Sequence, residues 1–88
     1  MTAIRKLAGR FTEADIDDEI ILMRLDNGDL LSLADSAAAT WRLIDGDRDR
    51  HSVVAALAAE YAADDQQIAA DVAELLHELM EAGLLAED

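Results

Sequence analysis

The 88-residue sequence contains no cysteine and no proline. Without cysteine the chain cannot form a disulfide, a thiolate nucleophile, or a cysteine-ligated zinc or iron–sulfur site. Only Trp41, Tyr61 and Phe11 are aromatic, whereas Ala and Leu dominate the apolar 52%. This composition favours helices over an all-β fold.

Long hydrophobic runs are also missing. No stretch of 18 apolar residues is present, so we expect no transmembrane helix. Residues 1–10 include Arg5, Lys6 and Arg10 but lack the apolar run and cleavage site of a signal peptide. Together with the lack of cysteine, this predicts a cytoplasmic protein without membrane contact.

Basic residues are scarce. The chain has 7 Lys and Arg against 20 Asp and Glu, for a net charge of −13, and residues 51–88 contain no Lys or Arg. Affinity for nucleic acid depends on cations that displace counterions from phosphates, so we expect no nucleic-acid partner. The acidic residues either form a solvated surface or attract a basic partner.

The chain length predicts a single domain spanning residues 1–88. A domain of this size has a net stability of about 4–13 kcal/mol, which leaves little to support a strained, enclosed active site.

An Asn-Gly pair at 27–28 separates the apolar stretches 20–25 and 30–33. Because these two residues tolerate the positive φ angles of a type I′ turn, the pattern predicts a β-hairpin. An isolated hairpin is marginally stable, so we also expect a third strand around residues 10–15.

A two-residue loop in this hairpin would place Leu25 opposite Leu30 and Leu22 opposite Leu33. Both faces of the hairpin would then carry apolar side chains. One face is therefore expected to cover the helices, and the other to be covered by the preceding chain or by a partner.

Two helices should follow the hairpin. The first is expected to begin at Asp35 or Ser36, either of which can cap it, and to end before Gly46. The second is expected to begin after Asp49 and to end near Ala62, because apolar residues recur there at helical spacing.

The third helix has the strongest pattern. Asp64 and Gln67 resemble a capping box, and an apolar stripe continues to Gly83. A sheet at residues 12–34 followed by three helices at 35–86 defines an α+β fold. Residues 1–11 match no predicted element, and we allow for a flexible segment there.

Two acidic patterns could indicate metal sites. An EF-hand loop beginning at Asp45 would need glycine at its sixth position and Glu at its twelfth, but these are Arg50 and Ala56. Glu74 and His77 have the spacing of a dimetal bundle motif, but no second copy exists. We therefore predict no metal site and an ordinary solvated turn at 45–49.

Catalytic groups are not evident either. The glycines are dispersed and form no phosphate-binding loop, and no serine lies in a nucleophile motif. The two histidines have no evident partner, so we expect both on the surface. These observations predict a protein that is not an enzyme and that needs no cofactor.

Four segments in order, at 28–33, 37–46, 53–61 and 68–85, resemble the strand-into-helix region and the later helices of the PqqD family. The resemblance covers residues 12–86. It implies a winged-helix-like fold with an N-terminal three-stranded antiparallel sheet followed by three helices.

Members of the PqqD family are recognition elements for ribosomally synthesised and post-translationally modified peptides (RiPPs). The resemblance therefore implies that the chain binds the leader of a precursor peptide and presents it to a separate enzyme. That enzyme would be a radical SAM enzyme, a cyclase or a leader protease. The leader would add a strand to the sheet edge at 30–33 and rest against the third helix.

The resemblance also assigns the peptide-binding residues. Strand pairing is assigned to Leu30, Leu31, Ser32 and Leu33, the pocket floor to Val72, Leu75 and Leu79, and contact with basic leader residues to Asp71, Glu74 and Glu78. The alternative for the apolar residues is simple core packing, and for the acidic residues a solvated helix face.

One departure from the family lies at the start of the second helix. The family has Thr followed by an aliphatic residue where this chain has Asp49 and Arg50. The resemblance therefore implies that the cap is retained while an apolar contact is lost.

Two other functions remain open. A winged-helix regulatory or dimerisation module is the first alternative, although the third helix lacks basic residues. A small hydrolase or enzyme subunit is the second. We expect a monomer or a weak homodimer, because an unpaired strand edge could recruit a second copy.

Overall fold

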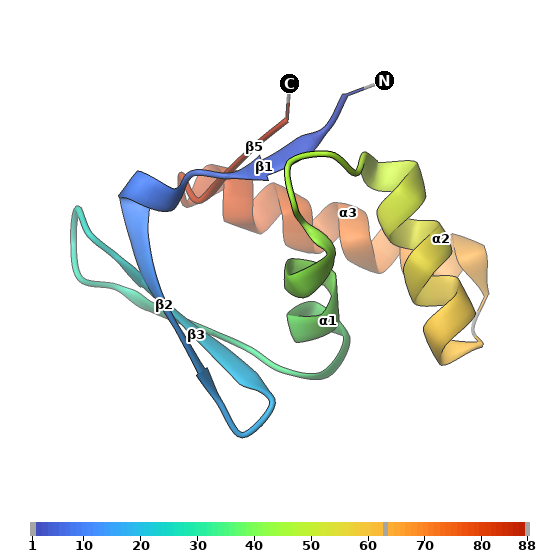
Figure 1. The fold of residues 1–88 in the computed structure, drawn as a ribbon, viewed down its shortest axis with the longest axis horizontal. Coiled ribbons are helices and arrows are strands. Elements are labelled where there is room, and N and C mark those ends of the chain that lie inside the picture. Colours follow the sequence, from blue (N-terminus) through green and yellow to red (C-terminus); the bar gives the residue numbers. More distant parts are fainter. Residues whose placement is uncertain (1, 63, 88) are drawn as a thin grey trace.

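The computed structural model describes residues 2–62 and 64–87; residues 1, 63 and 88 of the expected domain lie outside the described residues. The described residues form a three-stranded antiparallel sheet, three α-helices and a two-stranded sheet that joins the two ends of the chain (Figure 1). The elements are β1 (Ile4–Lys6), a 3-10 turn (Ala8–Arg10), β2 (Phe11–Ile16), β3 (Glu19–Arg24), β4 (Leu30–Leu33), α1 (Asp35–Leu43), α2 (Arg50–Tyr61), α3 (Asp65–Glu81) and β5 (Leu85–Glu87). The predicted α+β class and the expected third strand are confirmed.

The three-stranded sheet has the order β2-β3-β4, with antiparallel neighbours. Its register differs from the prediction by two residues, because Ile20 rather than Leu22 lies opposite Leu33, and Met23 lies opposite Leu30. A shift of two residues keeps every side chain on its predicted face, since strand side chains alternate with period two.

The loop between β3 and β4 explains the shift. Residues 25–28 form a turn closed by the N–H of Arg24, which donates to the carbonyl of Asp29 at 2.9 Å. Gly28 has a positive φ of 75° and donates to the carbonyl of Arg24, whereas Asn27 accepts a side-chain bond from the N–H of Asp29 at 3.0 Å. The predicted type I′ turn is wrong, because Asn27 stabilises the loop through its side chain rather than through a positive φ.

The two faces of this sheet differ in burial. Ile20, Leu22 and Leu33 point to the inner face and are buried, whereas Met23 and Leu30 point outward and are exposed. The inner face lies toward the helices, and α1 stands between the sheet and α2 (Figure 1). The helices thus cover one of the two apolar faces.

The start of the chain differs from the expected flexible segment. Residues 4–6 form β1, which pairs antiparallel with β5 next to both termini (Figure 1). Ile4 is fully buried, donates its N–H to the carbonyl of Arg48 at 2.9 Å and accepts a bond from Gly46 at 3.1 Å. Residues 85–87, of which 85 and 86 were assigned to the helical part, form a strand instead. Burial of Ile4 supplies the apolar contact that orders this segment.

Trp41 occupies the centre of the core and is fully buried. The ring of Phe11 meets it edge-on with centroids 5.3 Å apart, and Lys6 Nζ lies 4.5 Å from the centroid of the Trp41 ring. Burial lowers the pKa of Lys6, opposed by the carboxylates of Glu13 and Asp45. Trp41 thus joins the N-terminal segment and β2 to α1.

The first turn of α2 confirms the predicted cap. Asp49 accepts a hydrogen bond from the N–H of Ser52 at 2.8 Å, and this bond lowers the pKa of the Asp49 carboxyl. Arg50, where the resemblance implies an aliphatic residue, forms a bidentate pair with Glu87 of β5 at 2.8 and 3.0 Å, which raises its pKa. An ion pair therefore stands where the resemblance implies an apolar contact.

The caps of the other two helices differ from the prediction. The carboxylate of Asp64 accepts from the N–H of Gln66, whereas the side-chain amide of Gln67 donates to Asp71 and does not accept from the N–H of Asp64, so the capping box is not formed. The N-cap of α1 is Ala34, without a side-chain hydrogen bond, so the expected cap at Asp35 or Ser36 is wrong.

We expect Ile4→Ala to lower the free energy of unfolding by about 2–5 kcal/mol, because it removes a fully buried side chain from a packed core. The control is Thr2→Ala, an exposed position just before β1. Urea unfolding followed by circular dichroism measures both variants. Equal stabilities would contradict a structural role for the N-terminal segment.

Candidate functional site

The free edge of β4 is the first part of the candidate site. The N–H of Arg24 donates to Asp29 across the β3–β4 ladder. Because hydrogen-bonded and non-bonded pairs alternate in an antiparallel ladder, Leu31 and Leu33 direct their backbone groups toward β3. Leu30 and Ser32 direct theirs away from β3, and within the described residues no other strand pairs with β4.

The side chains of β4 point to two different environments. Leu31 is half-buried and Leu33 is buried against the core, whereas Leu30 is 68% exposed on the outer face. Ser32 is also exposed, and its hydroxyl donates to Glu19 Oε2 at 3.2 Å. The edge therefore combines unpaired backbone groups with side chains available on the outer face.

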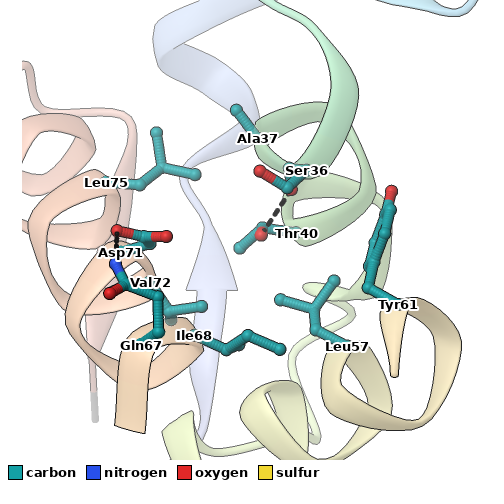
Figure 2. A pocket seen from close by; sticks show the side chains of 10 residues that line it. All are labelled: Ser36, Ala37, Thr40, Leu57, Tyr61, Gln67, Ile68, Asp71, Val72 and Leu75. Atoms are coloured by element: carbon teal, nitrogen blue, oxygen red, sulfur yellow. Dashed lines mark hydrogen bonds between the residues drawn. The ribbon is translucent and has the colours of Figure 1, made fainter. Parts of the chain in front are cut away.

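An apolar pocket of about 280 Å³ forms the second part of the site. Figure 2 shows side chains of α1, α2 and α3 around it. The lining residues are Ser36, Ala37, Thr40, Leu57, Tyr61, Gln67, Ile68, Asp71, Val72 and Leu75. Its size and apolar walls suit one or two large aliphatic or aromatic side chains.

The chain places this pocket next to the end of β4. Only Ala34 separates β4 from α1, so Ser36 and Ala37 at the pocket rim follow the edge strand directly. Inside, the hydroxyl of Thr40 donates to the carbonyl of Ser36 at 2.7 Å. This bond satisfies a polar group in an otherwise apolar wall, which keeps the pocket suited to apolar ligands.

The structure brings together only part of the predicted set. Asp71, Val72 and Leu75 of α3 line the pocket. Leu79, predicted for the pocket floor, is buried in the core and lies outside the lining of this pocket. Glu74 is on the exposed surface, also outside the lining.

The remaining acidic residue, Glu78, is exposed like Glu74. On the same surface, Glu81 Oε1 lies 3.6 Å from His77 Nε2. Because α3 carries no Lys or Arg, its exposed side presents uncompensated negative charge. That charge favours a cationic ligand near the pocket, but only Asp71 of the predicted acidic residues lines it.

The sequence-based prediction missed the pocket walls contributed by α1 and α2. The overlooked residues are Ser36, Ala37, Thr40, Leu57, Tyr61, Gln67 and Ile68. Tyr61 was available as a signal, because it is a lone aromatic residue at the end of an alanine-rich helix. Tyr61 follows Leu57 at helical spacing, but its side chain is 46% exposed whereas Leu57 is buried.

The described residues offer few alternatives for chemistry. They contain no group of three or more His, Asp or Glu side chains that could hold a metal ion. None of the helices in the described ranges is both long enough and apolar enough to span a bilayer. The edge of β4 and the adjacent pocket are therefore the features best suited to binding.

The family model of coenzyme PQQ synthesis protein D (PqqD) matches residues 19–85. The chain belongs to the PqqD family. The match begins at β3 and ends in β5, so it includes the free edge and all three helices that surround the pocket. No curated protein matches the chain significantly.

Two solved structures resemble this PqqD-family chain. One is TbiB1 in complex with the TbiA(beta) leader peptide, with 29% identity, 86% of this chain and 88% of that chain covered, and a TM-score of 0.79. The other is a lasso peptide synthetase B1 complexed with the leader peptide, with 23% identity, coverage of 94% and 96%, and a TM-score of 0.82. The second likeness establishes the fold.

The alternation along β4 predicts unequal effects of proline on folding. Ser32→Pro removes an N–H that points away from β3, whereas Leu31→Pro removes a ladder donor and leaves an acceptor of β3 unpaired. We expect Leu31→Pro to be less stable than Ser32→Pro by about 1–3 kcal/mol in urea unfolding. If Ser32→Pro were the less stable variant, the backbone groups of Leu30 and Ser32, rather than those of Leu31 and Leu33, would point toward β3.

Proposed function

We propose that this chain binds the leader segment of a ribosomally synthesised precursor peptide by β-strand addition and presents it to a separate modifying enzyme or protease. The observation that carries the proposal is the unpaired edge of β4 next to an apolar pocket. The leader-bound state of the related TbiB1, at 29% identity, supports it.

The backbone of β4 supplies the first component of binding. An extended leader segment beside β4 would exchange hydrogen bonds with the outward-pointing groups of Leu30 and Ser32. These bonds fix the position of the leader without selecting its sequence, because every residue except proline offers the same backbone groups.

The pocket supplies the second component. A leader continuing past the end of β4 would meet Ala37 and Leu75 at the pocket and could bury an apolar side chain between Ile68 and Tyr61. Burial of one large apolar side chain contributes about 1.5–3 kcal/mol, enough to distinguish it from a polar one. Of the acidic residues assigned to leader binding, Asp71 at the rim is best placed to meet a basic leader residue.

The chemistry is assigned to the partner enzyme. Membership of the PqqD family and the likeness to the leader-bound TbiB1 support a non-catalytic role. The partner would be a radical SAM enzyme, a cyclase or a leader protease. The acidic α3 does not favour the alternative of a DNA-contacting regulatory module.

Ser32→Pro tests the proposal, because it removes an outward N–H and adds a ring where the leader strand would lie. We expect affinity for the cognate leader to fall by about tenfold or more. Isothermal titration calorimetry with synthetic leaders of short precursors encoded near the gene measures this. The chain must remain folded by circular dichroism.

Glu13→Pro is the matched control. The N–H of Leu25 donates to the carbonyl of Arg10, which makes Arg10 and Leu25 a hydrogen-bonded pair of the β2–β3 ladder. Because such pairs alternate along the ladder, the backbone groups of Glu13 point away from β3, toward the free edge of β2. This variant should bind the leader with unchanged affinity. Equal losses for both proline variants, or no loss for either, would overturn strand addition at β4.

Filling the pocket tests the second component. Ala37→Trp places a large ring at the pocket rim, and we expect leader affinity to fall by about ten- to a hundredfold because an apolar side chain can no longer be buried. Ala59→Trp, at an exposed position of α2 outside the lining, is the control. Unchanged affinity of Ala37→Trp would place the leader elsewhere.

A further inference from the structure

The outer face of the three-stranded sheet is unusually apolar. Ile16, Met23, Leu25 and Leu30 are all large and exposed, and apart from Tyr61 they are the only such residues among those the structure describes. Met23 and Leu30 lie directly opposite each other on this face. Through this pair, exposed apolar surface reaches the free edge of β4.

Strand geometry determines what a leader strand must contact there. In an antiparallel pair, side chains of directly opposed residues lie on the same face with Cβ atoms about 4.5–5.5 Å apart. A leader residue opposite Leu30 must therefore place its side chain against Leu30, which is 68% exposed. An apolar residue at that leader position would cover Leu30 and approach Met23.

The neighbouring outer-face position has different chemistry. Ser32 is two residues from Leu30, and its hydroxyl donates to the exposed carboxylate of Glu19. A leader residue opposite Ser32 would project toward this carboxylate. Asp17 and Asp18, in the adjacent turn, add further negative charge at this end of the sheet. A Lys or Arg side chain is the complement of such a position.

We propose that the leader is also recognised on the sheet face that points away from the helices, through an apolar residue opposite Leu30 and a Lys or Arg opposite Ser32, two positions apart. The inference rests on the proposed function and names a second determinant of the sequence specificity of leader binding. If the leader is antiparallel to β4, its chain passes Ser32 before Leu30, so the basic residue precedes the apolar one in the leader sequence. The residue between them faces the helices.

Selection from a random 12-residue peptide library displayed on phage, against the immobilised full-length chain, tests this inference. We expect selected peptides to share a Lys or Arg two positions from a large apolar residue. Either order supports the inference and reports the direction of the added strand. The tightest-binding selected peptide is then synthesised and titrated against variants.

Glu19→Gln should weaken that peptide about two- to fivefold, as expected for an exposed ion pair. Leu30→Ser should weaken it by a similar factor through loss of a cross-strand apolar pair. Replacing the basic peptide residue with Gln should remove the effect of Glu19→Gln, which shows that the two groups interact directly. Asp47→Asn, which removes one charge from the α1–α2 loop, should leave affinity unchanged.

The outcomes separate this inference from the proposed function. Outer-face recognition is overturned, while strand addition stands, if the selected peptides lose affinity for the Ser32→Pro variant but lack a Lys or Arg two positions from a large apolar residue. It is also overturned if Glu19→Gln leaves peptide affinity unchanged, as Asp47→Asn should. If the selected peptides bind the Ser32→Pro variant as well as the original chain, strand addition itself is contradicted, and the inference fails with it.

Discussion

The backbone groups at the edge of a β-sheet need partners, and among the described residues neither outer edge of the three-stranded sheet, on β2 or on β4, has a neighbouring strand. β1 does not extend the three-stranded sheet but pairs with β5. β4 therefore retains outward-pointing donors and acceptors at Leu30 and Ser32. An exposed edge of this kind favours association with an extended chain, and the fold places an apolar pocket directly after it.

The edge and the pocket contribute different properties to binding. Backbone pairing along β4 provides affinity and position, whereas sequence selectivity has to come from side chains on either side of the added strand. On the helix side the pocket between α1, α2 and α3 accepts apolar groups. On the outer side, Leu30 and the Ser32–Glu19 pair offer an apolar and an acidic contact.

Local patterns in the sequence were sufficient for the order of the elements from β2 to α3 and for the faces of the hairpin. The side chains of Leu31 and Leu33 share one face of the hairpin with Leu22, as predicted, because a register error of two residues preserves alternation. The register itself could not be predicted, since Asn27 and Gly28 are compatible with several turns. The turn that forms is stabilised by the hydrogen bond that the Asn27 side chain accepts from the N–H of Asp29.

Long-range contacts account for the remaining differences. β1 and β5 are short and lack a local signal, so their pairing depends on burial of Ile4 and on the Arg50–Glu87 ion pair. The pocket combines residues from three helices, and no spacing in the sequence shows that Tyr61 is exposed beside Ile68. Leu79, by contrast, fits the same apolar stripe as Leu75 but lies in the core.

Hydrogen exchange of individual β4 amides, followed by NMR with and without a saturating leader peptide, tests strand addition most directly. In the free protein the Leu31 and Leu33 amides should be protected by β3, while those of Leu30 and Ser32 exchange rapidly. Leader binding should protect Leu30 and Ser32 selectively. Binding without a change in the exchange of these two amides would contradict the account.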